Sequence, residues 1–139
     1  MAAATLVAPN IEGARRLMKL MDAAGAPPRA VLWVFDPDRD AWRLWIAPST
    51  LPGRGGAGTP PLREFYAFVA PLMVAHRGEL GGLDSGEVHM VEPDHPAIVG
   101  LSRFVHVTDD SAVRTANNML NGYFLPDAVV LRMPVAKAA

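Results

Sequence analysis

Apolar and polar positions alternate along this chain with two different periods, which predict where helices and strands lie. Apolar residues recur at three- and four-residue spacing over residues 10–24, as on one face of an amphipathic helix. The same spacing returns over residues 61–77, where Pro71 must kink or divide the helix because its ring displaces a backbone hydrogen bond. The pattern therefore predicts two main helices, with Asn10 and Thr59 available as their caps.

The stretch from Arg29 to Pro48 reads as a β-hairpin, because two apolar runs flank the turn sequence Asp-Pro-Asp. A loop within residues 37–40 gives one wholly apolar face, whereas a slip of one residue would place Arg43 beside Trp33. The facing pairs on the apolar face are then Val31 with Ile46, Trp33 with Leu44, and Phe35 with Trp42. We expect this hairpin to supply the centre of a sheet.

The other face of the same hairpin carries Leu32, Val34, Arg43 and Trp45. It is too apolar to be left in water, so something must cover it. We expect either a second helix layer or a subunit partner there. In the second case these four residues form the interface.

The remainder of the chain predicts short strands and one short helix. Segments expected to be extended are residues 87–91, 104–107, 112–120 and 128–133. The short helix is expected to begin at Asp94 and Pro96, with Asp94 as its cap, and to end near Ser102. The pair Asn121-Gly122 is a strong hairpin signal and favours a type I′ turn.

This order of elements predicts an α+β fold. We expect a single domain over residues 1–139, with residues 1–8 and 134–139 as poorly ordered tails. Its sheet should be mostly antiparallel, with five to six strands built around the central hairpin. Two main helices and one short helix complete the expected fold.

Composition narrows the class of protein. Half of the residues are hydrophobic and 19% are charged, which excludes a mainly disordered chain. The 13 basic and 14 acidic residues give a net charge of −1, which argues against a nucleic-acid partner. The absence of cysteine excludes disulfides, thiolate metal sites and cysteine nucleophiles. Without a signal peptide or an apolar run long enough to span a membrane, a soluble cytoplasmic protein is expected.

The first candidate for chemistry is the glycine- and proline-rich stretch over residues 48–61. It leads into a predicted helix, and helix N-termini bind anions, so Arg54 and Thr59 are candidate ligand-binding residues. The stretch lacks the Gly-Lys-Ser/Thr ending of a phosphate-binding loop. We therefore interpret residues 53–59 as a mobile surface loop or a lid.

The histidines form the second candidate. His89 and His106 lie on predicted strands, and His95 follows Asp94. If the two strands are neighbours, His89, His106 and Glu87 converge into a His/carboxylate site suited to zinc or to general base catalysis. No His-Glu-x-x-His motif supports such a site, so we expect no metal and no cofactor. His89, His106 and Asp94 are the candidate catalytic residues.

A dense group of polar residues forms the third candidate. Its members are Asp109, Asp110, Ser111, Arg114, Asn117 and Asn118. Such a group on a loop and a strand suits a small polar ligand, with Asp109, Arg114 and Asn117 as the binding residues. The alternative is a turn followed by the solvent face of an edge strand, because Asn and Asp are common turn formers.

In the absence of a catalytic signature, we expect a non-enzymatic module that works by self-association or as an accessory subunit of a larger complex. The near-zero net charge removes a barrier to self-association. The alternative is a small enzyme or small-molecule-binding domain, with a cluster of His89, His106 and Asp94 covered by residues 53–59.

Overall fold

The computed structural model describes residues 8–49, 51, 59–109 and 111–133. Within them the helices are α1 (Ala8–Ala23), α2 (Leu62–Ala75) and α3 (Pro96–Leu101), with short 3-10 helices at Arg77–Glu79 and Ser85–Glu87. The strands are β1 (Ala30–Asp36), β2 (Ala41–Ala47), β3 (Val88–Met90), β4 (Val113–Thr115), β5 (Asn118–Leu120), β6 (Tyr123–Leu125) and β7 (Ala128–Arg132). The predicted single-domain α+β fold is confirmed. The predicted tails lie outside the described residues except for Ala8, which already belongs to α1.

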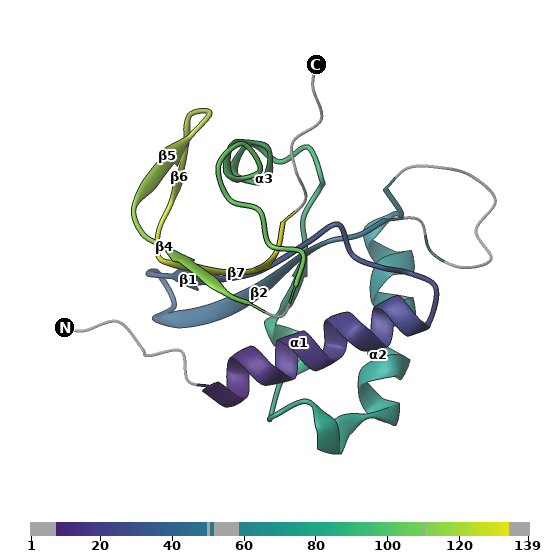
Figure 1. The fold of residues 1–139 in the computed structure, drawn as a ribbon. Helices are drawn as coiled ribbons and strands as arrows, with labels where there is room; N and C mark the ends of the chain where they lie inside the picture. Colours follow the sequence, from purple (N-terminus) through teal and green to yellow (C-terminus); the bar gives the residue numbers. More distant parts are fainter. Residues whose placement is uncertain (1–7, 50, 52–58, 110, 134–139) are drawn as a thin grey trace.

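The main sheet has five strands in the order β3-β2-β1-β7-β4, and β5 pairs with β6 in a separate two-stranded sheet (Figure 1). Strand β1 lies at the centre and pairs antiparallel with both β2 and β7. The β4–β7 pair is also antiparallel, whereas β3 runs parallel to β2. A parallel neighbour needs a long crossover, which the chain makes through α2. The sheet is thus mixed but mostly antiparallel.

The hairpin of β1 and β2 has the predicted register. Val31 faces Ile46, Trp33 faces Leu44, and Phe35 faces Trp42. Its turn occupies residues 37–40, and the carboxylate of Asp36 accepts a hydrogen bond of 3.0 Å from the backbone N–H of Asp38. Asp40 completes the turn with a φ of 48°. Local chemistry and the alternation of apolar residues therefore determine the centre of the sheet.

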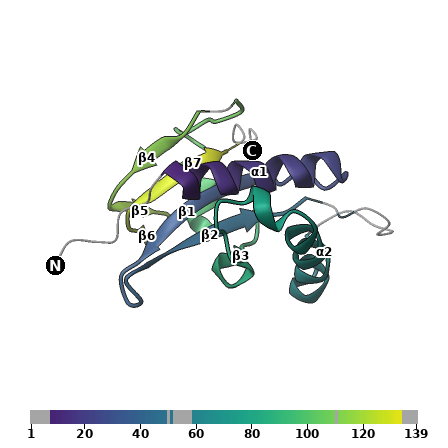
Figure 2. The ribbon, with the colours of Figure 1, turned by 90° about the horizontal axis from the view of Figure 1, so that it is seen from below.

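Helices α1 and α2 lie on one side of the sheet, and α3 and the β5–β6 hairpin lie on the other (Figures 1 and 2). The predicted apolar face of the hairpin packs under α1 and α2, and the residues of this core include Leu17, Met21, Trp33, Leu44, Phe65 and Val69. The indole Nε1 of Trp33 donates a hydrogen bond of 3.2 Å to the backbone oxygen of Asn10. This bond ties the first turns of α1 to the central strand. Among the described residues, no helix has both the length and the apolar character needed to cross a membrane.

A second core lies on the opposite side of the sheet and covers part of the other hairpin face. Leu32 and Val34 are only 0% and 4% exposed, because residues from α3, β5 and β6 share one core with them and with the neighbouring strand β7. The residues of this second core include Ile98, Leu101, Val105, Leu120, Leu125 and Val130. The expected covering layer is thus built by the chain itself, from a short helix and a hairpin. Leu32 and Val34 offer no surface to a partner, so that half of the predicted interface is wrong.

Several predicted boundaries and caps are wrong for local reasons. Helix α2 follows Pro61, and no side chain caps its first turn, so Thr59 is not its cap. The helix also continues through Pro71 as one element, so of the two predicted effects of Pro71 the division of the helix does not occur. The cap of α3 is His95, whose ring Nδ1 accepts a 3.1 Å hydrogen bond from the backbone N–H of Ala97. Asp94 is therefore not the cap.

Two predicted strands also differ from the observed ones. Residues 104–107 are not a strand, because only Val107 forms a bridge, with Met133. The extended stretch of residues 112–120 is divided into β4 and β5, and Asn117 between them has a φ of 53°. The predicted type I′ turn is present at Asn121 and Gly122, with φ angles of 51° and 83°.

Candidate functional site

The predicted catalytic residues do not form one site. His106 is exposed, and its Nε2 lies 2.9 Å from the backbone oxygen of Ser102. Asp94 is exposed in the turn before α3, and Glu87 accepts a hydrogen bond from the backbone N–H of Asp84 at a neighbouring loop. Over the part of the chain that the structure describes, no three His, Asp or Glu side chains are placed to hold a metal ion. The predicted convergence of His89, His106 and Glu87 is therefore wrong.

The predicted ligand-binding residues are also dispersed. Arg54 and most of the proposed lid lie outside the described residues, whereas Thr59 borders a shallow cavity of about 290 Å³ together with Asp94. The carboxylate of Asp109 accepts hydrogen bonds from the backbone N–H and the hydroxyl of Ser111, and these bonds lower the pKa of Asp109.

Arg114 and Asn117 are exposed, on the edge strand β4 and in the bend that follows it, and Asp110 is outside the described residues. The contacts of Asp109 are those of a local turn. The turn and edge-strand interpretation accounts for these residues.

The covered face of the hairpin ends at Arg43 and Trp45, which are only half-buried. The guanidinium group of Arg43 contacts Nε2 of His89 on the neighbouring strand β3. Its Nε lies 3.6 Å from the Asp36 carboxylate, and its Nη1 donates to the backbone oxygen of Gly86 at 3.5 Å. Arg43 is thus held in one orientation between the hairpin turn and strand β3.

Three rings meet beside Arg43. The ring centroid of Trp45 lies 5.2 Å from that of His95 and 6.1 Å from that of Tyr123, and the His95 and Tyr123 centroids are 4.7 Å apart. All three pairs have the edge-to-face geometry that aromatic rings prefer. Strand β6 brings Tyr123 here because the Asn121-Gly122 turn folds the chain back over the sheet.

The pKa values of the two histidines of this region, His89 and His95, are both lowered from the ordinary value for histidine. Burial is the main cause that lowers the pKa of both His89 and His95, and the positive charge of Arg43 lowers the pKa of His89 further. The positive charge of Arg43 is balanced on one side by the Asp36 carboxylate.

A cavity of about 310 Å³ opens at this place, between the hairpin turn and strand β6. We call it the Arg43 cavity, and its residues with charged or aromatic side chains are Phe35, Asp36, Asp38, Arg43, Trp45, Tyr123 and Phe124. Its volume is at the lower end of the range typical of small-molecule sites. The sequence pointed to Arg43, Trp45 and His89 separately, but it did not show that strand β6 would complete a cavity with them.

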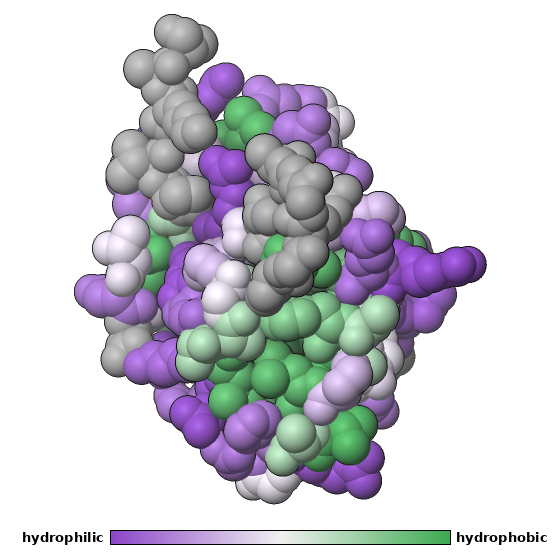
Figure 3. All heavy atoms as spheres, turned by 90° about the vertical axis from the view of Figure 1, so that its right-hand side faces the viewer, coloured by the Kyte–Doolittle hydropathy of each residue, from purple (hydrophilic) through white to green (hydrophobic). Residues whose placement is uncertain are grey.

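The outer face of α2 is a second candidate surface. Between Ala67 and Ala75 the exposed residues of this helix are Ala67, Ala70, Pro71, Val74 and Ala75. None carries a polar side chain, and Val74 is 61% exposed. Figure 3 shows the resulting hydrophobic area on the side of the molecule where α2 lies, with hydrophilic residues around it. We call these five residues the α2 face.

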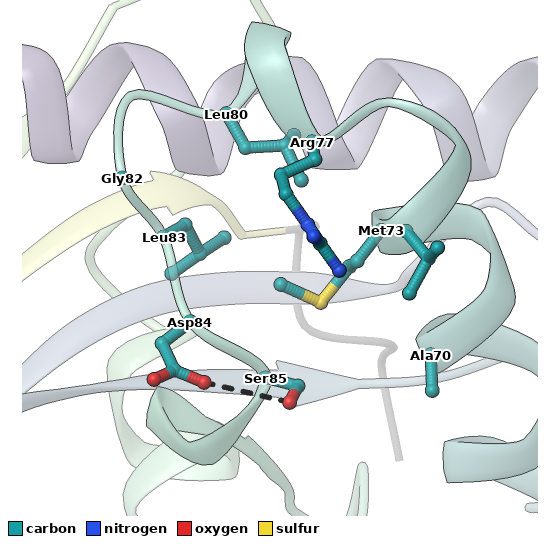
Figure 4. Close-up of a pocket in the computed structure, with 9 residues that line it drawn as sticks. Ala70, Met73, Arg77, Leu80, Gly82, Leu83, Asp84 and Ser85 are labelled. Carbon is teal, nitrogen blue, oxygen red and sulfur yellow. Dashed lines mark hydrogen bonds between the residues drawn. The ribbon is translucent and has the colours of Figure 1, made fainter.

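A cavity of about 420 Å³ adjoins the α2 face, between the C-terminal half of α2 and residues 80–85 (Figure 4). Met73, Leu80 and Leu83 supply its apolar lining, and Ala70 and Val74 belong to both the cavity and the α2 face. Arg77 extends into it towards Met73, while Ser85 on the far side donates a 3.5 Å hydrogen bond to Asp84 (Figure 4). The apolar surface of α2 therefore continues into a hollow with a polar rim.

No family model, curated protein or solved structure matches this chain.

The α2 face had a signal in the sequence. From Phe65 to Ala75 the chain has one polar side chain, that of Tyr66, whose hydroxyl donates to the backbone oxygen of Val88 at 2.9 Å. The apolar stripe over residues 61–77 accounts for the side of α2 that is buried against the sheet. It does not account for the apolar residues on the outer side of the helix. The missing charged residues on that outer side are what distinguishes this helix from an ordinary amphipathic one.

Proposed function

We propose that this chain is a protein-interaction module that self-associates through the α2 face. The supporting observation is that the exposed surface of α2 from Ala67 to Ala75 has no polar side chain. Helices that are apolar on all sides are normally buried, and exposed apolar patches with polar rims mark interaction sites. The proposed interface lies on α2, on the other side of the sheet from Arg43 and Trp45.

A second copy of the chain suits this surface. The net charge of −1 causes little repulsion between two copies. One basic and one acidic exposed residue lie near each end of α2: Arg63 with Glu64 in its first turn, and Arg77 with Glu79 in the 3-10 helix that follows it. The ends of two helices therefore meet without net repulsion. The small side chains of the α2 face also allow two helices to approach closely, since interaxial distances depend on the side chains at the contact.

The test introduces a charge on the α2 face. We expect the wild-type chain to elute as a dimer in size-exclusion chromatography with light scattering at high micromolar concentration. Val74→Glu should elute as a monomer, because a dimer would have to bury the new carboxylate without a partner. The two proteins should have similar thermal stability when dilute, since the side chain at position 74 is exposed.

The matched control is Met119→Glu, which places the same charge on another exposed apolar side chain. Met119 is 67% exposed and lies on strand β5, on the opposite side of the sheet from α2 (Figure 1). This variant should remain a dimer. A monomeric wild-type chain, or equal loss of the dimer in both variants, would contradict the proposal.

A further inference from the structure

The Arg43 cavity is a gap in the layer that covers the sheet. This layer leaves Leu32 and Val34 only 0% and 4% exposed, with Val34 at the border of the cavity, but it leaves Arg43 and Trp45 half-buried. At the same place Tyr123 and Phe124 remain exposed, although both are large aromatic residues. An opening over polar and aromatic side chains has the composition of a ligand site.

The charges around this cavity are of both signs. Arg43 supplies a planar cation at the sheet, and Asp36 and Asp38 supply carboxylates at the hairpin turn. Arg39 adds a second positive charge outside, with its Nε 3.8 Å from the Asp36 carboxylate. A ligand with one charge would meet an attractive group on one side and a repulsive one on the other, whereas a zwitterion satisfies both.

We propose that the Arg43 cavity binds a small aromatic zwitterion of the α-amino acid class. The carboxylate of this ligand lies against the guanidinium of Arg43, which has the fork geometry that suits a carboxylate. Its ammonium group faces Asp36 and Asp38, and its ring packs against Trp45 and the exposed rings of strand β6.

The surroundings of Arg43 support this arrangement. His89 and the backbone oxygen of Gly86 hold its guanidinium, so less conformational entropy is lost when a ligand binds. Burial lowers the pKa of both His89 and His95, which disfavours a further positive charge beside Arg43. The site lies on the other side of the sheet from the α2 face, so its test is independent of the dimer.

The experiment compares L-phenylalanine with phenylacetate, which lacks the ammonium group, and with phenethylamine, which lacks the carboxylate. Binding is followed by backbone amide chemical shifts in two-dimensional NMR. We expect saturable shifts at residues around Arg43 and Tyr123 with L-phenylalanine. Each truncated compound should bind about tenfold more weakly, because one charge-assisted hydrogen bond is lost.

Three variants make the result specific. Arg43→Gln and Asp38→Asn should each weaken L-phenylalanine binding by about tenfold. Asp38 is exposed, so its variant remains informative if Arg43→Gln fails to fold. Arg103→Gln, at an exposed arginine beyond α3, should bind like the wild type. Equal affinity for the three compounds, shifts that do not saturate, or unchanged binding by Asp38→Asn would each overturn the proposal.

Discussion

Replacing Trp33 with alanine is expected to lower the free energy of unfolding by about 3–5 kcal/mol, the range measured for large aromatic residues in protein cores. Trp33 is 0% exposed and lies on the central strand, between β2 and β7. The change leaves a cavity under α1 and removes the indole hydrogen bond to the backbone oxygen of Asn10. Urea denaturation followed by far-ultraviolet circular dichroism measures this loss.

Trp45 provides the matched control in the same hairpin. It lies on the opposite face and is only half-buried, so Trp45→Ala should cost clearly less than Trp33→Ala. Equal losses for the two variants, or a loss within experimental error for Trp33→Ala, would mean that the core is assigned to the wrong face.

Gly13→Ala is expected to destabilise the protein by about 1–3 kcal/mol, as overpacking usually does. This sign is opposite to intrinsic helix propensity, which favours alanine over glycine by about 1 kcal/mol. A Cβ at position 13 would lie 2.0 Å from the backbone oxygen of Leu80 and 2.7 Å from its carbonyl carbon. Because the obstacle is backbone, α1 or residues 80–81 must move to admit the methyl group.

The comparison variant is Gly78→Ala, in the 3-10 helix that precedes Leu80. A Cβ at Gly78 meets no atom within 4 Å, so this variant should be close to neutral. Thermal denaturation of both variants beside the wild type measures the difference. A Gly13→Ala protein that is as stable as the wild type would show that the close approach of α1 to residue 80 contributes nothing to stability.

The sequence was sufficient where neighbours in the chain decide the structure. The register of β1 and β2 follows from alternating apolar residues and a four-residue turn, and the Asn121-Gly122 turn follows from backbone conformations that few residues adopt. The sequence was insufficient where a residue's contacts come from a segment far away along the chain. The requirement for glycine at position 13 comes from the backbone of Leu80, which lies in a segment far along the chain.

The same reason explains the errors in the candidate sites. Leu32 and Arg43 share one face of the hairpin, yet one is buried and the other borders a cavity. The difference in burial between these two residues depends on where α3 and β6 end over the sheet. The pattern of residues within the hairpin does not predict this. His89 was identified as a chemically interesting residue, but its contact is Arg43 on the parallel neighbour strand rather than His106. The sequence shows which residues are charged or chemically reactive, but it does not show which of them come together in the folded protein.

The central position of β1 also constrains how the protein is made. Leu32 pairs with Trp45 on one side and with Val130 on the other. The first partner is close to Leu32 in the sequence, whereas the second lies near the end of the described residues. While the ribosome is still adding the later residues, one side of the middle strand has no partner and exposes its backbone groups. We expect a ribosome-bound chain that stops before Ala128 to be sensitive to protease, and the sheet to form as a late, single event.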